Sequence, residues 1–157
     1  MPKLNLFDLG EKNEQLAQQL PEFFAKWERE IDEAAPIFNL DGMRLELVAR
    51  NIPHHQVFYA QRAIEARAVV KWLENQKARA ESRYVKNYNN SPRALGVKEQ
   101  AQYLQGEKEI VELNQLIIQA ALHQQSFDEI VEAVRQLGWM VGHIVKLRVA
   151  ELQDSII

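Results

Sequence analysis

The sequence has no cysteine, little glycine or proline, and no long apolar run. Without cysteine, the 157-residue chain can form neither a disulfide nor a thiolate metal site, and it has no cysteine nucleophile. No apolar run approaches the roughly 18 residues that span a bilayer, and residues 1–5 lack the charged-then-apolar pattern of a secretory signal. We therefore expect a cytoplasmic protein that does not cross a membrane.

The composition favours an all-α fold. Six glycines and five prolines leave long intervals filled by Ala, Gln, Glu, Leu, Lys and Arg, which are good helix formers. We expect one compact unit with two regions: short helices over residues 1–50, and a longer helical core over residues 51–157. In the first region Pro21 separates predicted helices at 11–20 and 22–35, and Pro53 closes a third at 43–50.

A long helix is predicted from His54 to about Tyr88, an interval without glycine or proline. Apolar and small residues recur along it at alternating steps of four and three, which is typical of a coiled coil or a packed helix pair. This apolar seam consists of Tyr59, Ala63, Ala66, Val70, Leu73, Lys77, Ala80 and Tyr84. The sequence thus predicts a long helical hairpin or coiled-coil-like bundle.

Positive charge is concentrated on this helix. Residues 61–100 hold nine Lys/Arg against four Asp/Glu, whereas the segments before and after them each have a net charge of −4. Opposite the seam, Trp72, Arg79, Arg83 and Lys86 fall within one narrow sector at about 100° per residue. We call these four residues the basic edge. Lys71 and Lys77, together with Arg67, add positive charge nearby.

Two interpretations of the basic edge remain open. Arg79 and Arg83 are like charges at i,i+4, and Arg83 and Lys86 at i,i+3, spacings that destabilise a bare helix by about 0.2–0.5 kcal/mol each. A polyphosphate would neutralise them with release of counterions, and Trp72 could stack a base. Alternatively, the acidic helices of the same protein cover the edge. Tyr84 and Tyr88 lie on the seam and add nothing to a stacking platform.

The last third of the chain is apolar and predicted to be helical. The stretch from Tyr103 to Leu122 is too apolar for a solvated helix, so it must pack against partners. A capping box from Ser126 to Glu129 predicts that a new helix begins there, and Gly138 with Gly142 indicates a kink, a break or a tight helix crossing. These helices offer more apolar surface than a monomer of this size buries, so we expect a homo-oligomer held by its C-terminal helices.

No motif indicates catalysis. Walker, dinucleotide-binding, HExxH and GxSxG patterns are absent. The adjacent His54 and His55 point about 100° apart on a helix, and His123 and His143 have no ligand-type neighbour at i+4. We expect no enzyme activity, no metal and no cofactor. A helical nucleotide-handling enzyme whose carboxylates bind magnesium is a weaker alternative, because no inward-facing ExxE-type pair is evident.

The order of these features resembles the UvsY-type recombination mediators of phages. The similarity spans roughly residues 50–152 and rests on three stretches: the long helix that opens at Ile52-Pro53 with His55 and Tyr59 and ends at Tyr88-Asn89-Asn90, the acidic helix from about Tyr103 to Leu122, and residues 135–144. The first 45 or so residues have no clear counterpart, and Leu137 replaces an arginine usual in the family.

The resemblance implies a ring-like homo-oligomer that binds single-stranded DNA without sequence preference. It also implies contacts with a RecA-like recombinase and a single-strand-binding protein, in homologous recombination and repair within a bacterial host cytoplasm. The DNA-binding candidates are Lys71, Trp72, Lys77, Arg79, Arg83 and Lys86. The alternative is a helical scaffold or adaptor without nucleic-acid binding.

Overall fold

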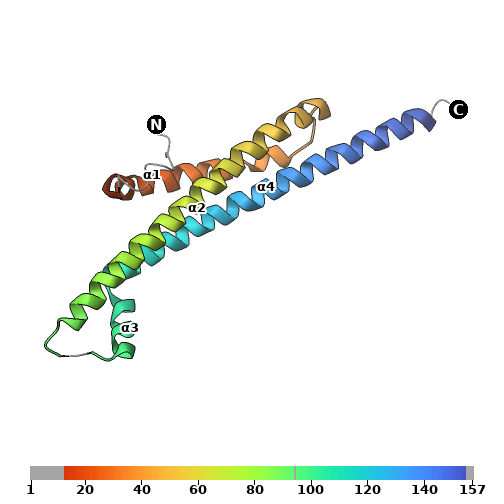
Figure 1. The fold of residues 1–157 in the computed structure, drawn as a ribbon. Helices are drawn as coiled ribbons and strands as arrows, with labels where there is room; N and C mark the ends of the chain where they lie inside the picture. The colour runs from red at the N-terminus through yellow and green to blue at the C-terminus, as the bar shows by residue number, and fades with distance from the viewer. Residues whose placement is uncertain (1–12, 94, 155–157) are drawn as a thin grey trace. The chain divides into compact units, whose positions relative to one another are not determined.

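A computed structural model describes residues 13–93 and 95–154. Four α-helices and one 3₁₀-helix follow one another: α1 (Asn13–Asp32), η2 (Ala35–Phe38), α2 (Leu45–Asn89), α3 (Val97–Gly106) and α4 (Lys108–Asp154) (Figure 1). The described part of the chain contains no strand, so the prediction of an all-α fold is confirmed. None of these helices is both long enough and apolar enough to cross a bilayer.

The chain divides into two compact units, and each unit combines segments from before and after residue 50. The described part of unit 1 consists of residues 13–20 and 65–122, and that of unit 2 of residues 21–64 and 123–154. Within each unit, a segment of α2 lies beside an antiparallel segment of α4, and α1 contributes to both units (Figure 1). The predicted helix pair is therefore formed by α2 and α4.

The core of unit 2 is built on aromatic rings. Trp27 of α1 and Phe127 of α4 are fully buried and meet edge to face, with ring centroids 6.3 Å apart. Tyr59 of α2 packs against Phe127, also at 6.3 Å, and its hydroxyl donates a hydrogen bond to the Glu30 carbonyl. His123 is buried and stacked on Phe24. Aromatic side chains thus join all three helices of this unit.

The core of unit 1 is made of smaller aliphatic side chains. Ala66, Val69 and Leu73 of α2 are at most 1% exposed. Ile110 and Ala120 of α4 are also buried, and Leu16 and Leu20 bring the start of α1 into this core. Small residues at the contact allow two helices to approach closely.

Most of the predicted seam lies in these cores. Tyr59, Ala63, Ala66, Leu73 and Ala80 are buried, and the other three seam positions are partly exposed. The alternating steps of four and three therefore identified the packed side of α2 correctly.

Two prolines predicted to delimit helices lie inside them. Pro21 is in α1 and Pro53 in α2, and both are exposed. A proline inside a helix removes one hydrogen bond and costs about 3 kcal/mol. In α1 the apolar face continues through the proline, because Leu20 and Phe24 are buried on either side of it. Burial of that face offsets the cost. The predicted start of this helix at residue 11 lies outside the described residues.

Boundaries predicted in the last third were also wrong. Ser126 lies in the interior of α4 and starts no helix, and α4 passes through Gly138 and Gly142 without a break. A methyl group built on Gly138 would lie 3.7 Å from Ile52 Cγ2 of α2, an ordinary van der Waals contact, so the packing there does not require a glycine. A boundary that was not predicted separates α3 from α4 at Glu107, whose backbone is extended.

Candidate nucleic-acid interface

An open groove in unit 1 contains half of the predicted DNA-binding residues. Trp72, Arg79 and Arg83 line it from α2, because positions 72, 79 and 83 return to the same side of a helix. The groove has a volume of about 570 Å³. Its remaining lining residues are Ala17, Gln76, Ala80, Glu109, Glu112, Leu113 and Leu116. The groove therefore combines an apolar floor with charged walls of both signs.

Arg79 and Lys86 carry exposed and uncompensated positive charge. Both side chains are exposed, and among the described residues neither has a carboxylate within ion-pair distance. They lie one turn before and almost one turn after Arg83, on the same side of α2. These closely spaced like charges are the feature from which the sequence indicated an anionic partner.

Arg83 has a partner within the protein. Its Nη2 atom donates hydrogen bonds to both Glu109 carboxylate oxygens, each at 2.7 Å. The side chains of Arg83 and Glu109 are 60% and 46% exposed, so water surrounds the pair. The second interpretation, in which an acidic helix of the same protein covers the basic edge, therefore applies at Arg83.

Two of the three predicted lysines, none of which lines the groove, pair with glutamates of their own helix. Lys71 lies 3.5 Å from Glu74, and Lys77 lies 3.6 Å from Glu81. Such exposed pairs along a helix contribute only about 0.3–0.5 kcal/mol and exchange readily with other anions. Both lysines remain sources of long-range positive potential, but the groove does not include them.

Trp72 does not lie on the open surface that its sequence position suggested. Its side chain is only 8% exposed, between the floor residues of the groove and the core of unit 1. A base needs an accessible ring face for stacking. The structure therefore assigns Trp72 to the core, and the basic edge keeps its three cationic members.

Two seam tyrosines and two glutamates form hydrogen bonds near the Arg83 pair. Tyr84 donates a hydrogen bond to Glu109 at 3.3 Å, and Tyr88 donates one to Glu107 at 2.6 Å. Desolvation of the Tyr88 hydroxyl, its hydrogen bond to Glu107 and the negative charge of that residue raise the pKa of Tyr88 to about 12. Desolvation and then Glu109 raise the pKa of Tyr84 as well. The end of α2 is thus tied to the start of α4 by four polar side chains and Arg83.

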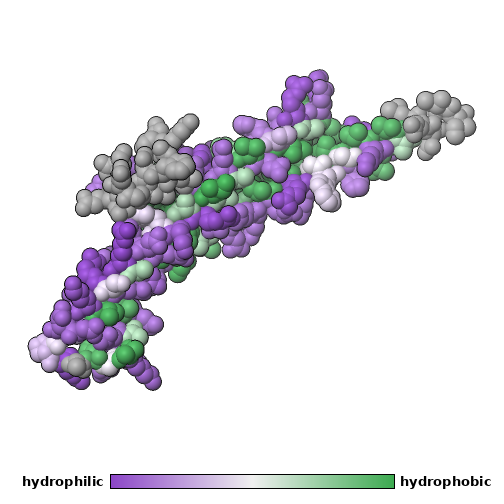
Figure 2. Space-filling model, viewed as in Figure 1, coloured by the Kyte–Doolittle hydropathy of each residue, from purple (hydrophilic) through white to green (hydrophobic). Residues whose placement is uncertain are grey.

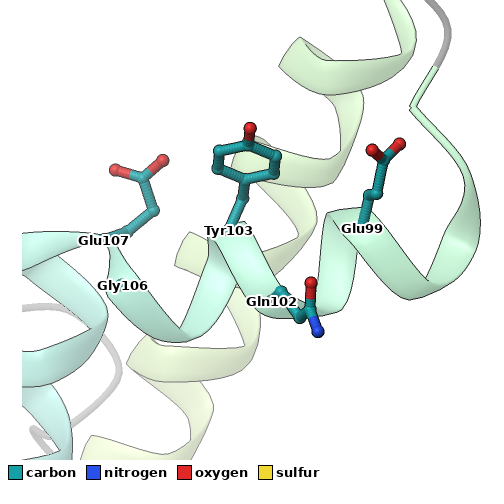
Figure 3. A pocket seen from close by; sticks show the side chains of 5 residues that line it. All are labelled: Glu99, Gln102, Tyr103, Gly106 and Glu107. Atoms are coloured by element: carbon teal, nitrogen blue, oxygen red, sulfur yellow. The ribbon is translucent and has the colours of Figure 1, made fainter.

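A second hollow of about 420 Å³ lies on α3 and is acidic. Glu99, Tyr103 and Glu107 project from one side of the chain, and Gln102 points away from them (Figure 3). The Glu99 carboxylate accepts the Gly96 backbone N–H, and Glu107 already accepts the Tyr88 hydroxyl. Within the described residues, no group of three His, Cys, Asp or Glu side chains is arranged to hold a metal ion.

The C-terminal part of α4, in unit 2, has several exposed apolar side chains interspersed with charged ones. Trp139 is 73% exposed and Leu147 is 65% exposed, and hydrophobic side chains gather over this end of the helix (Figure 2). Met140, Val145 and Val149 are also exposed. Because most of its side chain is exposed, Trp139 is not part of the core of this chain.

Comparisons with protein-family models, with curated proteins and with solved structures find no match for this chain.

Proposed function

We propose that this protein is a non-enzymatic recombination mediator of the UvsY type. It binds single-stranded DNA through the basic edge of α2 and assists the loading of a RecA-like recombinase in place of a single-strand-binding protein. The resemblance over residues 50–152 supports the family, and the site geometry supports the DNA contact. Its place of action is the cytoplasm of a bacterial host.

The uncompensated cations of α2 carry this proposal. Arg79 and Lys86 are exposed, and no described carboxylate lies within ion-pair distance of either. Each one that contacts a phosphate releases condensed counterions, which adds affinity whatever the base sequence. A row of guanidinium and ammonium groups along one helix suits an extended strand of phosphates better than a single small anion.

Self-association through α4 belongs to the same proposal, with a second copy of the chain as the partner. The exposed apolar residues of its C-terminal part, above all Trp139 and Leu147, supply a surface that a second copy would bury. Each subunit then presents one basic edge. Contacts that are weak singly sum through multivalency when several copies engage one strand.

Fluorescence anisotropy with labelled oligo-dT over a salt series tests the DNA contact. We expect binding that weakens steeply with salt. Arg79→Ala combined with Arg83→Ala should reduce the affinity and flatten the logarithmic salt slope by about 0.7 for each phosphate that is no longer neutralised. Lys98→Ala, compared with Arg79→Ala alone, is the charge-matched control, because each removes one exposed cation that has no described ion-pair partner. Absence of binding at low salt refutes the mediator function.

Sedimentation velocity tests the assembly. Leu147→Glu places a charge in the exposed apolar surface of α4 and should yield monomers, whereas Val57→Glu changes an equally apolar, 58% exposed position of α2 and should leave the oligomer intact. A wild-type protein that sediments as a monomer at every concentration contradicts the assembly part of the proposal.

A helical scaffold or adaptor without nucleic-acid binding is the second candidate function. The Arg83–Glu109 pair favours it, since this contact shows that the acidic start of α4 satisfies part of the basic edge internally. In this alternative the oligomer forms, and oligo-dT does not bind even at low salt.

A further inference from the structure

The contact between Arg83 and Glu109 uses one particular nitrogen of the guanidinium group. Nη2 donates to both carboxylate oxygens, and within the described part of the chain Nε and Nη1 have no hydrogen-bond acceptor. The Arg83 side chain also lies over the neighbouring Tyr84 ring, with its Cζ atom 5.9 Å from the ring centroid. The orientation of the group is thus set by one carboxylate and one ring.

The position of that nitrogen matters for phosphate binding. A guanidinium group binds a phosphate or carboxylate through two parallel N–H bonds. It can do so from the Nε and Nη2 side or from the Nη1 and Nη2 end, and both modes use Nη2. Each mode uses one of the two Nη2 hydrogens, and Glu109 holds both of its oxygens 2.7 Å from this nitrogen, so its negative charge competes with either two-point contact with a phosphate.

We propose that Glu109 is an internal competitor for the DNA phosphate at Arg83, and so the residue that sets how much this arginine contributes to binding. The proposal rests on the proposed function. A strand that binds displaces the Glu109 carboxylate from Nη2 and releases the Tyr84 hydroxyl bonded to the same carboxylate. Within the described part of the chain, no carboxylate would have to leave Arg79 or Lys86.

The exposure of the pair makes this exchange feasible. Both side chains are about half exposed, and solvated ion pairs are weak and screened by salt. A phosphate carries a full negative charge like the carboxylate and gains further from release of its counterions. Glu109 thus lowers the affinity of Arg83 for phosphate but does not prevent binding.

Removal of the charge at position 109 provides the test. In oligo-dT anisotropy at low salt, Glu109→Gln should tighten binding by about two- to fivefold, the range expected for an exposed ion pair. It should also steepen the salt slope by up to about 0.7, the value for one phosphate neutralised on a single strand. Glu112→Gln is the matched control, because it removes one charge from the same groove and the same helix without touching Arg83.

The dependence on Arg83 distinguishes competition from a general change of charge. In an Arg83→Ala background, Glu109→Gln should change the affinity no more than Glu112→Gln does. If Glu109→Gln and Glu112→Gln act alike in the wild-type background, or if Glu109→Gln acts equally without Arg83, the competitor role is refuted while DNA binding stands. If neither the wild type nor any variant binds oligo-dT at low salt, the proposed function itself fails.

Discussion

The ion pair between Glu30 of α1 and Arg62 of α2 should be a principal electrostatic contribution to the stability of unit 2. Arg62 donates from Nε to Glu30 Oε2 at 2.6 Å and from Nη2 to Oε1 at 3.0 Å, the two-point geometry that the Arg83 pair lacks. The side chains are only 16% and 13% exposed. The guanidinium also lies 4.8 Å from the centroid of the Phe58 ring.

The expected magnitude follows from this burial. Loss of one partner from a buried pair costs about 3–5 kcal/mol, because the other charge stays desolvated. Glutamine keeps the shape of Glu30 and one acceptor oxygen, so Glu30→Gln should lower the free energy of unfolding by about 2–4 kcal/mol. Arg62→Met keeps most of the stem that packs on the ring, and the double variant should lose less than the sum of the two single losses.

Urea denaturation followed by circular dichroism at fixed protein concentration measures these differences. The control is Glu46→Gln, which breaks a 3.3 Å pair with Arg50 on the surface of α2, where the side chains are 82% and 72% exposed. It should change the stability by no more than about 0.5 kcal/mol, and added salt should abolish even that. If Glu30→Gln matches Glu46→Gln, or if the double variant is additive, the pair does not couple α1 to α2 as argued.

Three further predictions concern other parts of the fold. Phe127→Ala empties a fully buried aromatic position and should cost about 3–5 kcal/mol in the same assay, whereas Leu122→Ala, at a 58% exposed position, should stay within about 0.5 kcal/mol. Pro53→Ala restores a backbone donor inside α2 and should raise the stability by about 1–3 kcal/mol, and an unchanged melting temperature would contradict this. The folded chain holds the Tyr88 proton more tightly than the unfolded chain, so this contribution is intact below about pH 10, the unfolded pKa, and is lost as the pH rises through the folded value of about 12. Absorbance at 295 nm should show a tyrosine ionisation near pH 12 in the wild type, and Tyr88→Phe should remove this step.

Much of the candidate site was predictable because it depends on one helix. Residues 72, 79, 83 and 86 share a side of α2 by helical geometry alone, and the seam was recognised by the same periodicity. The partner of Arg83 was not predictable. Glu109 lies 26 positions away, and only the antiparallel packing of α4 on α2 in unit 1 brings it to Nη2. Acidic charge in that helix was the only sequence signal, and it did not identify a residue.

The sequence by itself determined the all-α class, the long central helix and the segregation of charge, because composition and local periodicity govern these properties. Tertiary structure decided where helices continue through prolines and which charged side chains have a partner within the protein. Pro21 and Pro53 remain within helices because burial along a whole face outweighs one missing hydrogen bond, and Trp72 lies in the core rather than on the basic edge. Which cations stay uncompensated depends on distances between helices, and no local pattern encodes those distances.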